Sequence, residues 1–223
     1  IARLDRDSSG FGRMTQVLSA FRERKIDVLV GTQMVTKGHD FPGVTLVGVI
    51  LADHGLNFPD FRSAERTFQL LCQVAGRAGR GEEPGKVLVQ TYNPNHHSIV
   101  CAQTHDYRAF FQQELRLRSR LGYPPSGHLV AVRFQGDEAK EVVELATEVA
   151  RTARKGWENK GIEVLGPSEA PLSKLRGKTR WHLLLKSSNR GPLQELTAQL
   201  TQLTPSSSSK LRMSIDVDPL DMM

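Results

Sequence analysis

The chain has 223 residues, of which 39% are hydrophobic and 24% are charged, and its formal net charge is +6. This composition is typical of soluble globular proteins and excludes a disordered tail or a collagen-like fibre. No apolar run approaches the ~18 residues of a membrane span or forms a signal-peptide core, and the two cysteines are too few for a disulfide framework, so we expect a cytoplasmic protein with no membrane partner.

The first half of the sequence alternates between expected strands and helices. Short apolar runs predict buried strands at 26–32, 44–53 and 85–92. Apolar residues at helical spacing predict helices at 11–25 and 63–79. Because strands and helices alternate, we expect an α/β layer with a parallel sheet.

The pattern changes after residue 97. A helical segment at 98–121 stops at Gly122-Tyr123-Pro124-Pro125, because two prolines prevent the helix from continuing. Beyond this predicted boundary the expected order is β-α-β-β-α-β, at 128–136, 137–155, 161–169, 179–188, 191–203 and 210–219. This is the ferredoxin-like order, in which two helices cover one face of a four-stranded antiparallel sheet.

Two phrases in the first half suggest phosphate chemistry. The first is Gln73-Val74-Ala75-Gly76-Arg77-Ala78-Gly79-Arg80, in which two arginines follow a helix and could neutralise charge on a departing γ-phosphoryl group. The alternative is a capped helix end with solvated arginines. The second phrase, residues 31–40, follows a predicted strand at the edge where α/β sheets bind ligands. There Thr32 offers a hydroxyl to a nucleic-acid phosphate, Gly38 permits close approach, and Asp40 can accept from a ribose hydroxyl.

These phrases carry a resemblance to a known family. GTQMVTKGHDFP and QVAGRAGR resemble motifs V and VI of superfamily 2 helicases. Together with the opening RLDRD, the PDFRSAERTFQLL run, the Tyr-Pro-Pro junction and the closing IDVDP, they resemble the PriA family (primosomal protein N′) of replication-restart DNA helicases. The resemblance implies a truncated RecA-like second helicase lobe at 1–97, a helical connector at 98–122, and a DNA- and SSB-binding domain at 123–223.

The resemblance also implies roles for single residues. Arg80 is similar to the arginine finger of the family, Arg77 and Gln73 to its ATP-contacting partners, and Gly38 and Asp40 to the nucleotide-sensing end of motif V. Thr32 is similar to the residue that holds a phosphate of the translocating strand. The phrase before motif VI contains Asp60, Arg62, Glu65 and Arg66, and its two arginines are candidates for DNA contact; surface ion pairs with Glu65 are the alternative.

Members of this family are ATP-dependent 3′→5′ helicases that recognise stalled or branched forks and initiate primosome assembly. The implied partners are branched and single-stranded DNA, the acidic tail of single-stranded DNA-binding protein (SSB) and other primosome proteins, and the implied location is nucleoid-associated. The implied cofactors are ATP and Mg²⁺, with zinc in an element upstream of this chain and no metal within it. The sequence contains no Gly-x-x-x-x-Gly-Lys-Thr/Ser loop, so we expect the isolated chain neither to hydrolyse ATP nor to unwind DNA. The alternatives are another superfamily 2 motor, RecG-like or an RNA helicase, and a non-catalytic nucleic-acid-binding adaptor.

The segment 171–190 is basic and contains no acidic residue. Its cations include Lys174, Arg176, Lys178 and Arg180, and Trp181 and His182 follow them. This pattern suits contacts to the DNA backbone, with base stacking on the aromatic neighbour as a possibility. A solvated charged surface is the alternative.

Two smaller sets of residues are also candidates. Arg190 precedes a predicted helix and Gln194 lies one turn further on, which favours binding of the SSB tail carboxylate. His97, Cys101 and His105 are four residues apart and could share a helical face toward a metal. The simpler interpretation is that His97 caps a helix, Cys101 packs as an apolar residue and His105 is solvated.

Overall fold

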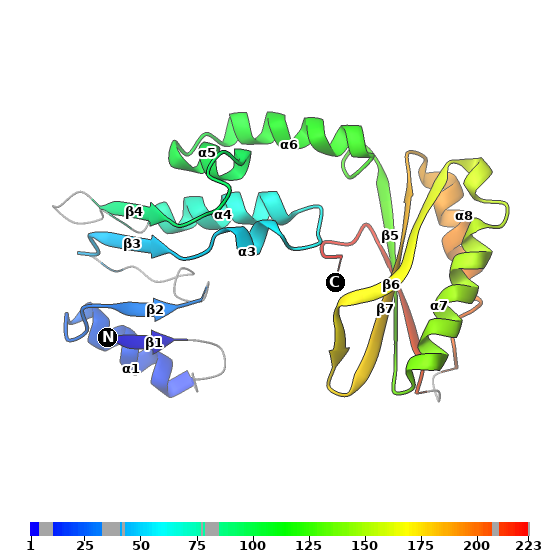
Figure 1. Cartoon of the computed structure of the whole chain (residues 1–223), viewed down its shortest axis with the longest axis horizontal. Coiled ribbons are helices and arrows are strands. Elements are labelled where there is room, and N and C mark those ends of the chain that lie inside the picture. The colour runs from blue at the N-terminus through cyan, green and yellow to red at the C-terminus, as the bar shows by residue number, and fades with distance from the viewer. Residues whose placement is uncertain are drawn as a thin grey trace. The chain divides into compact units, whose positions relative to one another are not determined.

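The computed structural model describes residues 1–4, 11–32, 41, 43–76, 78, 85–206 and 210–222. It divides into two compact units, one of Ile1–Phe58 with Ser63–Phe110 and the other of Pro59–Arg62 with Phe111–Met223 (Figure 1). Within the described ranges, no helix is both long enough and apolar enough to cross a membrane.

The first unit is mixed α/β and contains two pairs of parallel strands. One pair is β1 with β2 and the other is β3 with β4. Its elements are β1 (Ala2–Leu4), α1 (Phe11–Arg22), β2 (Leu29–Gly31), β3 (Leu46–Val49), α3 (Asp53–Leu56), α4 (Ser63–Ala75), β4 (Lys86–Val89), α5 (His97–Gln103) and the first turn of α6 (Tyr107–Leu121). The predicted strands and helices of this half are confirmed, with shorter bounds. The strand β1 and the short helix α3, which replaces the end of the strand expected at 44–53, were not predicted.

Helix α4 is held by one apolar stripe. Phe68, Leu71 and Val74 are buried at helical spacing along it. The Phe68 ring stacks on that of Phe110 with 4.2 Å between centroids and 4° between planes. Ile99 and Cys101 of α5 complete this core cluster. The cluster fixes the position of the helix that carries Gln73.

The single helix predicted at 98–121 is two helices, which corrects that prediction. The chain leaves α5 at Thr104, His105 has a positive φ of 53°, and α6 starts at Tyr107. The Asp106 carboxylate accepts from the Ala109 N–H at 2.8 Å and so caps the new helix. The four residues at the break, 103–106, are all polar and end in the capping Asp106, a signal that the sequence interpretation missed.

The second unit has the predicted β-α-β-β-α-β order of elements. Its strands pair in the order β6-β7-β5-β8, all antiparallel. In Figure 1, α7 and α8 lie on the same side of this sheet. Besides the rest of α6, the elements are β5 (His128–Gly136), α7 (Ala139–Arg154), a 3-10 turn (Glu158–Lys160), β6 (Ile162–Leu175), β7 (Lys178–Ser187), α8 (Arg190–Thr201) and β8 (Arg212–Val217).

Alternation along the strands separates the two faces of this sheet. Val130, Val132 and Phe134 of β5 face the helices and belong to the main core, together with Val149 of α7 and Leu196 of α8. The intervening residues of β5, which include Ala131 and Arg133, face the other side. We call this second side the open face, because neither α7 nor α8 covers it.

Strand β6 is longer than the predicted strand at 161–169. It contains Pro167 and Pro171, and proline cannot donate to a strand ladder. Here β6 is an edge strand, and its pairing with β7 shifts register between Leu165 and Ser168 and between Glu169 and Lys174. Prolines are tolerated at such edges and bulges, so β6 and β7 form one long hairpin.

Candidate nucleic-acid interface

The helicase-motif residues of the first unit lie at the ends of its elements. Strand β2 ends at Gly31, and the exposed Thr32 follows directly at the carboxyl end of this parallel strand. Gln73 is half-buried in the last turn of α4. Gly38, Asp40, Arg77 and Arg80 lie outside the described residues. The roles of all six therefore stay predictions.

Asp53 is a buried carboxylate that the sequence interpretation did not single out. Its two oxygens accept from the Tyr92 backbone N–H at 2.9 Å, the Asn93 side-chain amide at 3.0 Å and the Thr91 hydroxyl at 3.1 Å. Burial alone raises the pKa of this carboxyl, but these hydrogen bonds outweigh burial and hold the pKa below its ordinary 3.8. The ionised carboxylate therefore ties α3 to the segment after β4, which is a structural role.

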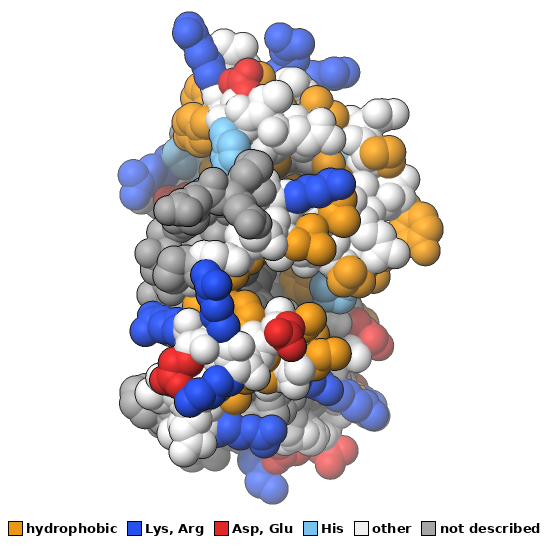
Figure 2. Space-filling view, turned by 90° about the vertical axis from the view of Figure 1, so that its left-hand side faces the viewer, with side chains coloured by type: hydrophobic (Ala, Val, Ile, Leu, Met, Phe, Trp, Pro, Cys, Tyr) orange, Lys and Arg blue, Asp and Glu red, His pale blue; other side chains and the backbone are white. Residues whose placement is uncertain are grey.

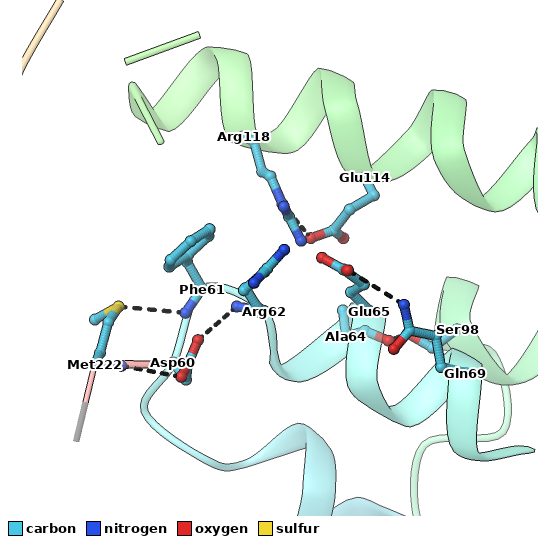
Figure 3. A network of polar contacts seen from close by, with 10 residues as sticks. All are labelled: Asp60, Phe61, Arg62, Ala64, Glu65, Gln69, Ser98, Glu114, Arg118 and Met222. Carbon is cyan, nitrogen blue, oxygen red and sulfur yellow. Dashed lines mark hydrogen bonds and ion pairs between the residues drawn. The ribbon is translucent and has the colours of Figure 1, made fainter. Parts of the chain in front are cut away.

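The four charged residues before and in the first turns of α4 are divided between two environments. Asp60 and Arg62 belong to the loop Pro59–Arg62 of the second unit, where the Arg62 guanidinium lies 5.9 Å from the centre of the Phe61 ring. Glu65 and Arg66 are half-buried on α4, and Glu65 accepts a hydrogen bond from Gln69 at 3.2 Å (Figure 3). Whether the two arginines contact DNA stays a prediction.

The cations predicted to bind DNA lie on the β6–β7 hairpin. Its ladder pairs Lys174 with Thr179 and Leu175 with Lys178, and the chain turns at Arg176 and Gly177. Strand β5 ends opposite Thr179, so the tip of the hairpin extends beyond β5. Lys174 and Arg176 are exposed. The hairpin therefore presents basic side chains on a narrow, two-stranded projection.

A further cation that the sequence interpretation missed lies beside them. Gln135 of β5 pairs with Arg180 of β7 on one side and with Arg212 of β8 on the other. Residues directly opposite in an antiparallel ladder share a face, so these three side chains form one row across the open face. The row places Arg212 next to the hairpin cations.

The cations at this end of the sheet differ from other cations of the unit in their ion pairs with carboxylates. Arg133 pairs with Asp216 at 2.9 Å, Arg118 with Glu114 at 2.8 Å, and Lys186 with Glu163 at 2.8 Å. We define the hairpin set as the five cations Lys174, Arg176, Lys178, Arg180 and Arg212. Within the described ranges, no carboxylate forms an ion pair with any of them. Their charge is therefore available to an outside anion.

The suggested base stacking on Trp181 stays a prediction, and the ring is partly buried. Trp181 pairs with Phe134 across the ladder and packs, partly buried, against the core beneath the helices. It lies on the opposite face from Arg180, its neighbour in the strand, because successive side chains of a strand alternate. The Trp181 ring and the Arg180 side chain therefore lie on opposite faces of the sheet.

Arg190 and Gln194 line a common pocket in the second unit. The pocket has a volume of about 250 Å³, and its lining also includes His128 of β5, Thr197 of α8 and Asp218. Arg190 opens α8, and the Asn189 side chain caps the helix by accepting from the Gly191 N–H at 3.1 Å. The guanidinium and the helix N-terminus therefore lie at the same rim.

The three residues of the histidine–cysteine set do not share one helix, because α5 ends before His105. His96, rather than His97, caps α5, and its Nδ1 accepts from the Ser98 N–H at 3.2 Å. The His97 ring stacks on Phe110, and His105 lies in the break between α5 and α6. Cys101 is buried in the apolar core, as predicted. Within the described parts of the chain, no three His, Cys, Asp or Glu residues lie close enough together to hold a metal ion.

On the face drawn in Figure 2, which is the left-hand side of Figure 1, the described lysines and arginines lie among acidic, apolar and uncharged side chains from top to bottom.

Comparisons with known proteins place both parts of the chain in one family. Residues 119–220 match the primosomal protein N C-terminal domain, and residues 3–82 match the helicase conserved C-terminal domain. Replication restart protein PriA of Bacillus subtilis is 42% identical over 100% of this chain and 28% of its own length. The PriA proteins of Synechocystis sp. and Haemophilus influenzae are 44% and 37% identical, over 95% and 100% of this chain and 25% and 30% of their own lengths.

The chain belongs to the PriA family. It spans between a quarter and a third of the length of these curated PriA relatives. The PriA C-terminal match contains the hairpin set and the Arg190 pocket, and the helicase match contains Thr32 and Gln73. The boundaries predicted at residues 97 and 123 stay predictions within this PriA framework.

Proposed function

We propose that this chain is the part of a PriA-type, ATP-dependent 3′→5′ replication-restart helicase that binds fork DNA and partner proteins. The observation that carries the proposal is the hairpin set, five cations at one end of a sheet with no carboxylate paired to them among the described residues. The names of its relatives, which are replication restart proteins, support the same function. Nucleoid association and contacts with other primosome proteins are part of this proposal.

The domain types are also proposed. The β6-β7-β5-β8 order and the two helices on one face support a ferredoxin-like second unit. The parallel pairs of strands in the first unit support a RecA-like helicase lobe.

The physical argument for DNA binding rests on phosphate charge. Each cation that neutralises a DNA phosphate releases condensed counterions, and the slope of log affinity against log salt changes by about −0.9 for each contact. A narrow projecting hairpin can follow the backbone near a branch. An unpaired cation also loses no internal partner when it binds a phosphate.

Binding of this chain to forked DNA tests the proposal. The variant K174A/R176A/K178A/R180A should bind at least about tenfold more weakly at 0.1 M salt, with a salt slope smaller by about 3.6, about 0.9 for each of the four cations. The matched control is K140A/R151A/K155A, which removes exposed cations from α7 and the residue after it. Equal weakening by both variants would leave only generic electrostatics and would contradict the proposal.

We propose the pocket at the start of α8 as the site for the SSB tail. A terminal carboxylate would bind beside Arg190 and the helix N-terminus, in the pocket that Asp218, a residue of like charge, also lines. The SSB tail peptide should bind the chain, and Arg190→Ala or Gln194→Ala should weaken it by about tenfold or more. The same peptide with a C-terminal amide should bind more weakly. Equal binding of both peptides would contradict this assignment.

In the complete protein, we propose that Arg80 supplies the arginine finger to ATP and Mg²⁺ that a part of the protein other than this chain holds. Arg77, Gln73, Gly38 and Asp40 would contribute to the same nucleotide site. Replacement of Arg80 by Ala should lower DNA-stimulated ATP hydrolysis by about 10³-fold while DNA affinity stays unchanged. Retained hydrolysis would remove Arg80 from this role.

A further inference from the structure

The loop Pro59–Arg62 belongs to the second unit, although the segments before and after it belong to the first. Helix α3 ends at Leu56, and α4 begins at Ser63, directly after the loop. The chain therefore enters the second unit for only four residues and then continues into the helix that carries Gln73 and leads to the arginines of motif VI.

Within the second unit, the loop is held by its aromatic residue. The Phe61 ring stacks on Tyr123 with 5.5 Å between centroids and 3° between planes. The Arg118 guanidinium, paired with Glu114, lies 5.1 Å from the centre of the same ring (Figure 3). Phe61 also packs against the cluster of Ala131, Leu184 and Met222 on the open face of the sheet.

Hydrogen bonds fasten the loop to the C-terminal segment. The Phe61 N–H donates to the Met222 sulfur at 3.5 Å, and the Met222 N–H donates to the Asp60 carboxylate at 3.2 Å. The other Asp60 oxygen accepts from the Arg62 N–H at 2.8 Å. Arg133 of β5 holds the C-terminal segment through Asp216 and the Asp221 carbonyl. The loop, the segment and β5 thus form one connected set of contacts.

We propose that these contacts transmit DNA binding by the second unit to α4, with Phe61 and Met222 as positioning residues for the motif VI arginines. Arg133 lies two residues from Gln135 along β5, in the next row on the same face as the Arg212–Gln135–Arg180 row, and also holds the C-terminal segment. An anion at the row therefore perturbs residues that hold Phe61. Because α4 starts one residue after Arg62 and a helix is stiff, a displaced loop displaces the helix. This inference rests on the proposed function.

The test uses the complete helicase that contains this chain. Phe61→Ala and Met222→Ala should each leave basal ATP hydrolysis and fork affinity within about twofold of wild type, while stimulation by fork DNA falls at least about fivefold. Phe61→Tyr keeps the stacked ring and should keep the stimulation. Leu172→Ala, which truncates an exposed side chain of β6, is the matched control and should change none of these values.

A second measurement separates transmission from mere stability. Fork DNA should slow amide exchange at residues 64–75 in the wild type but not in the Phe61→Ala or Met222→Ala variants. Undiminished stimulation in both folded variants, or exchange that responds equally in all three proteins, would overturn the inference. A wild-type helicase with no DNA-stimulated hydrolysis would instead contradict the proposed function, which keeps the two failures distinguishable.

Discussion

His182 is a histidine held neutral in the sheet of the second unit. It pairs with Arg133 across the ladder, and its Nδ1 is buried with no hydrogen-bond partner within the described structure. Burial lowers its pKa below the ordinary 6.5, and the charges of Arg133 and Arg180 lower it further. Below pH 6.5 the unfolded chain therefore takes up a proton that the folded chain does not.

The second unit should accordingly lose stability as the pH falls from 7 to 5. Thermal unfolding in this range should show a falling Tm for the wild type and a flatter profile for His182→Gln. The control is His105→Gln, which changes an exposed histidine of the first unit. A profile for His182→Gln as steep as that of the wild type would show that another group titrates.

Arg212 is the one member of the hairpin set that comes from a distant part of the sequence. Its neighbour Arg180 is reached only through the pairing of both strands with β5. Arg212→Ala should lower the salt slope of fork binding by about 0.9 and weaken binding several-fold. Arg151→Ala on α7 is the single-cation control, and an equal effect of the two changes would argue against the row.

The turn of the β6–β7 hairpin depends on one glycine. Gly177 has a φ of +77°, and a Cβ there would meet nothing within 4 Å, so the cost of a side chain is conformational. Gly177→Ala should lower the free energy of unfolding of the second unit by about 1 kcal/mol. Gly191→Ala in α8, where φ is not positive, should be neutral or stabilising, and denaturant unfolding of both variants checks this pair.

Elements with strong local signals were predictable from the sequence. Helices α4, α7 and α8 and the strands of the second unit follow from apolar spacing alone. The break between α5 and α6 was missed, although the polar residues 103–106 and the capping Asp106 are a local signal for it; the positive φ of His105 is visible only in the structure. The full length of β6 was also hidden, since its prolines are tolerated only because β6 is an edge strand.

The site shows the same division between local and long-range information. The cations of 174–180 follow from a charge run in the sequence, and the pairing of Arg190 with Gln194 follows from helical spacing. Arg212 and the Phe61 contacts depend on strand register and on chain segments that are far apart in sequence. Local patterns carry no such information, so neither was predictable.

At the scale of the whole chain, two units with separate cores should unfold separately. Phe134 is 1% exposed in the core of the second unit, and Phe68 is 4% exposed in a core of the first. Phe134→Ala should destabilise the second unit by about 3–5 kcal/mol, and Phe68→Ala should destabilise the first by a similar amount. Differential scanning calorimetry should show each change acting mainly on one transition, and a single cooperative transition shifted equally by both would contradict this division.

The most direct measurement of where DNA binds is photo-cross-linking of this chain to forked DNA that carries a photoreactive group near the branch. Mass spectrometry should place the cross-links on residues 174–180 and around Arg212, with few on α7. K174A/R176A/K178A/R180A should lose them. Cross-links that fall mainly on α7, or that persist unchanged in this variant, would contradict the claim that the hairpin set is the DNA-binding surface.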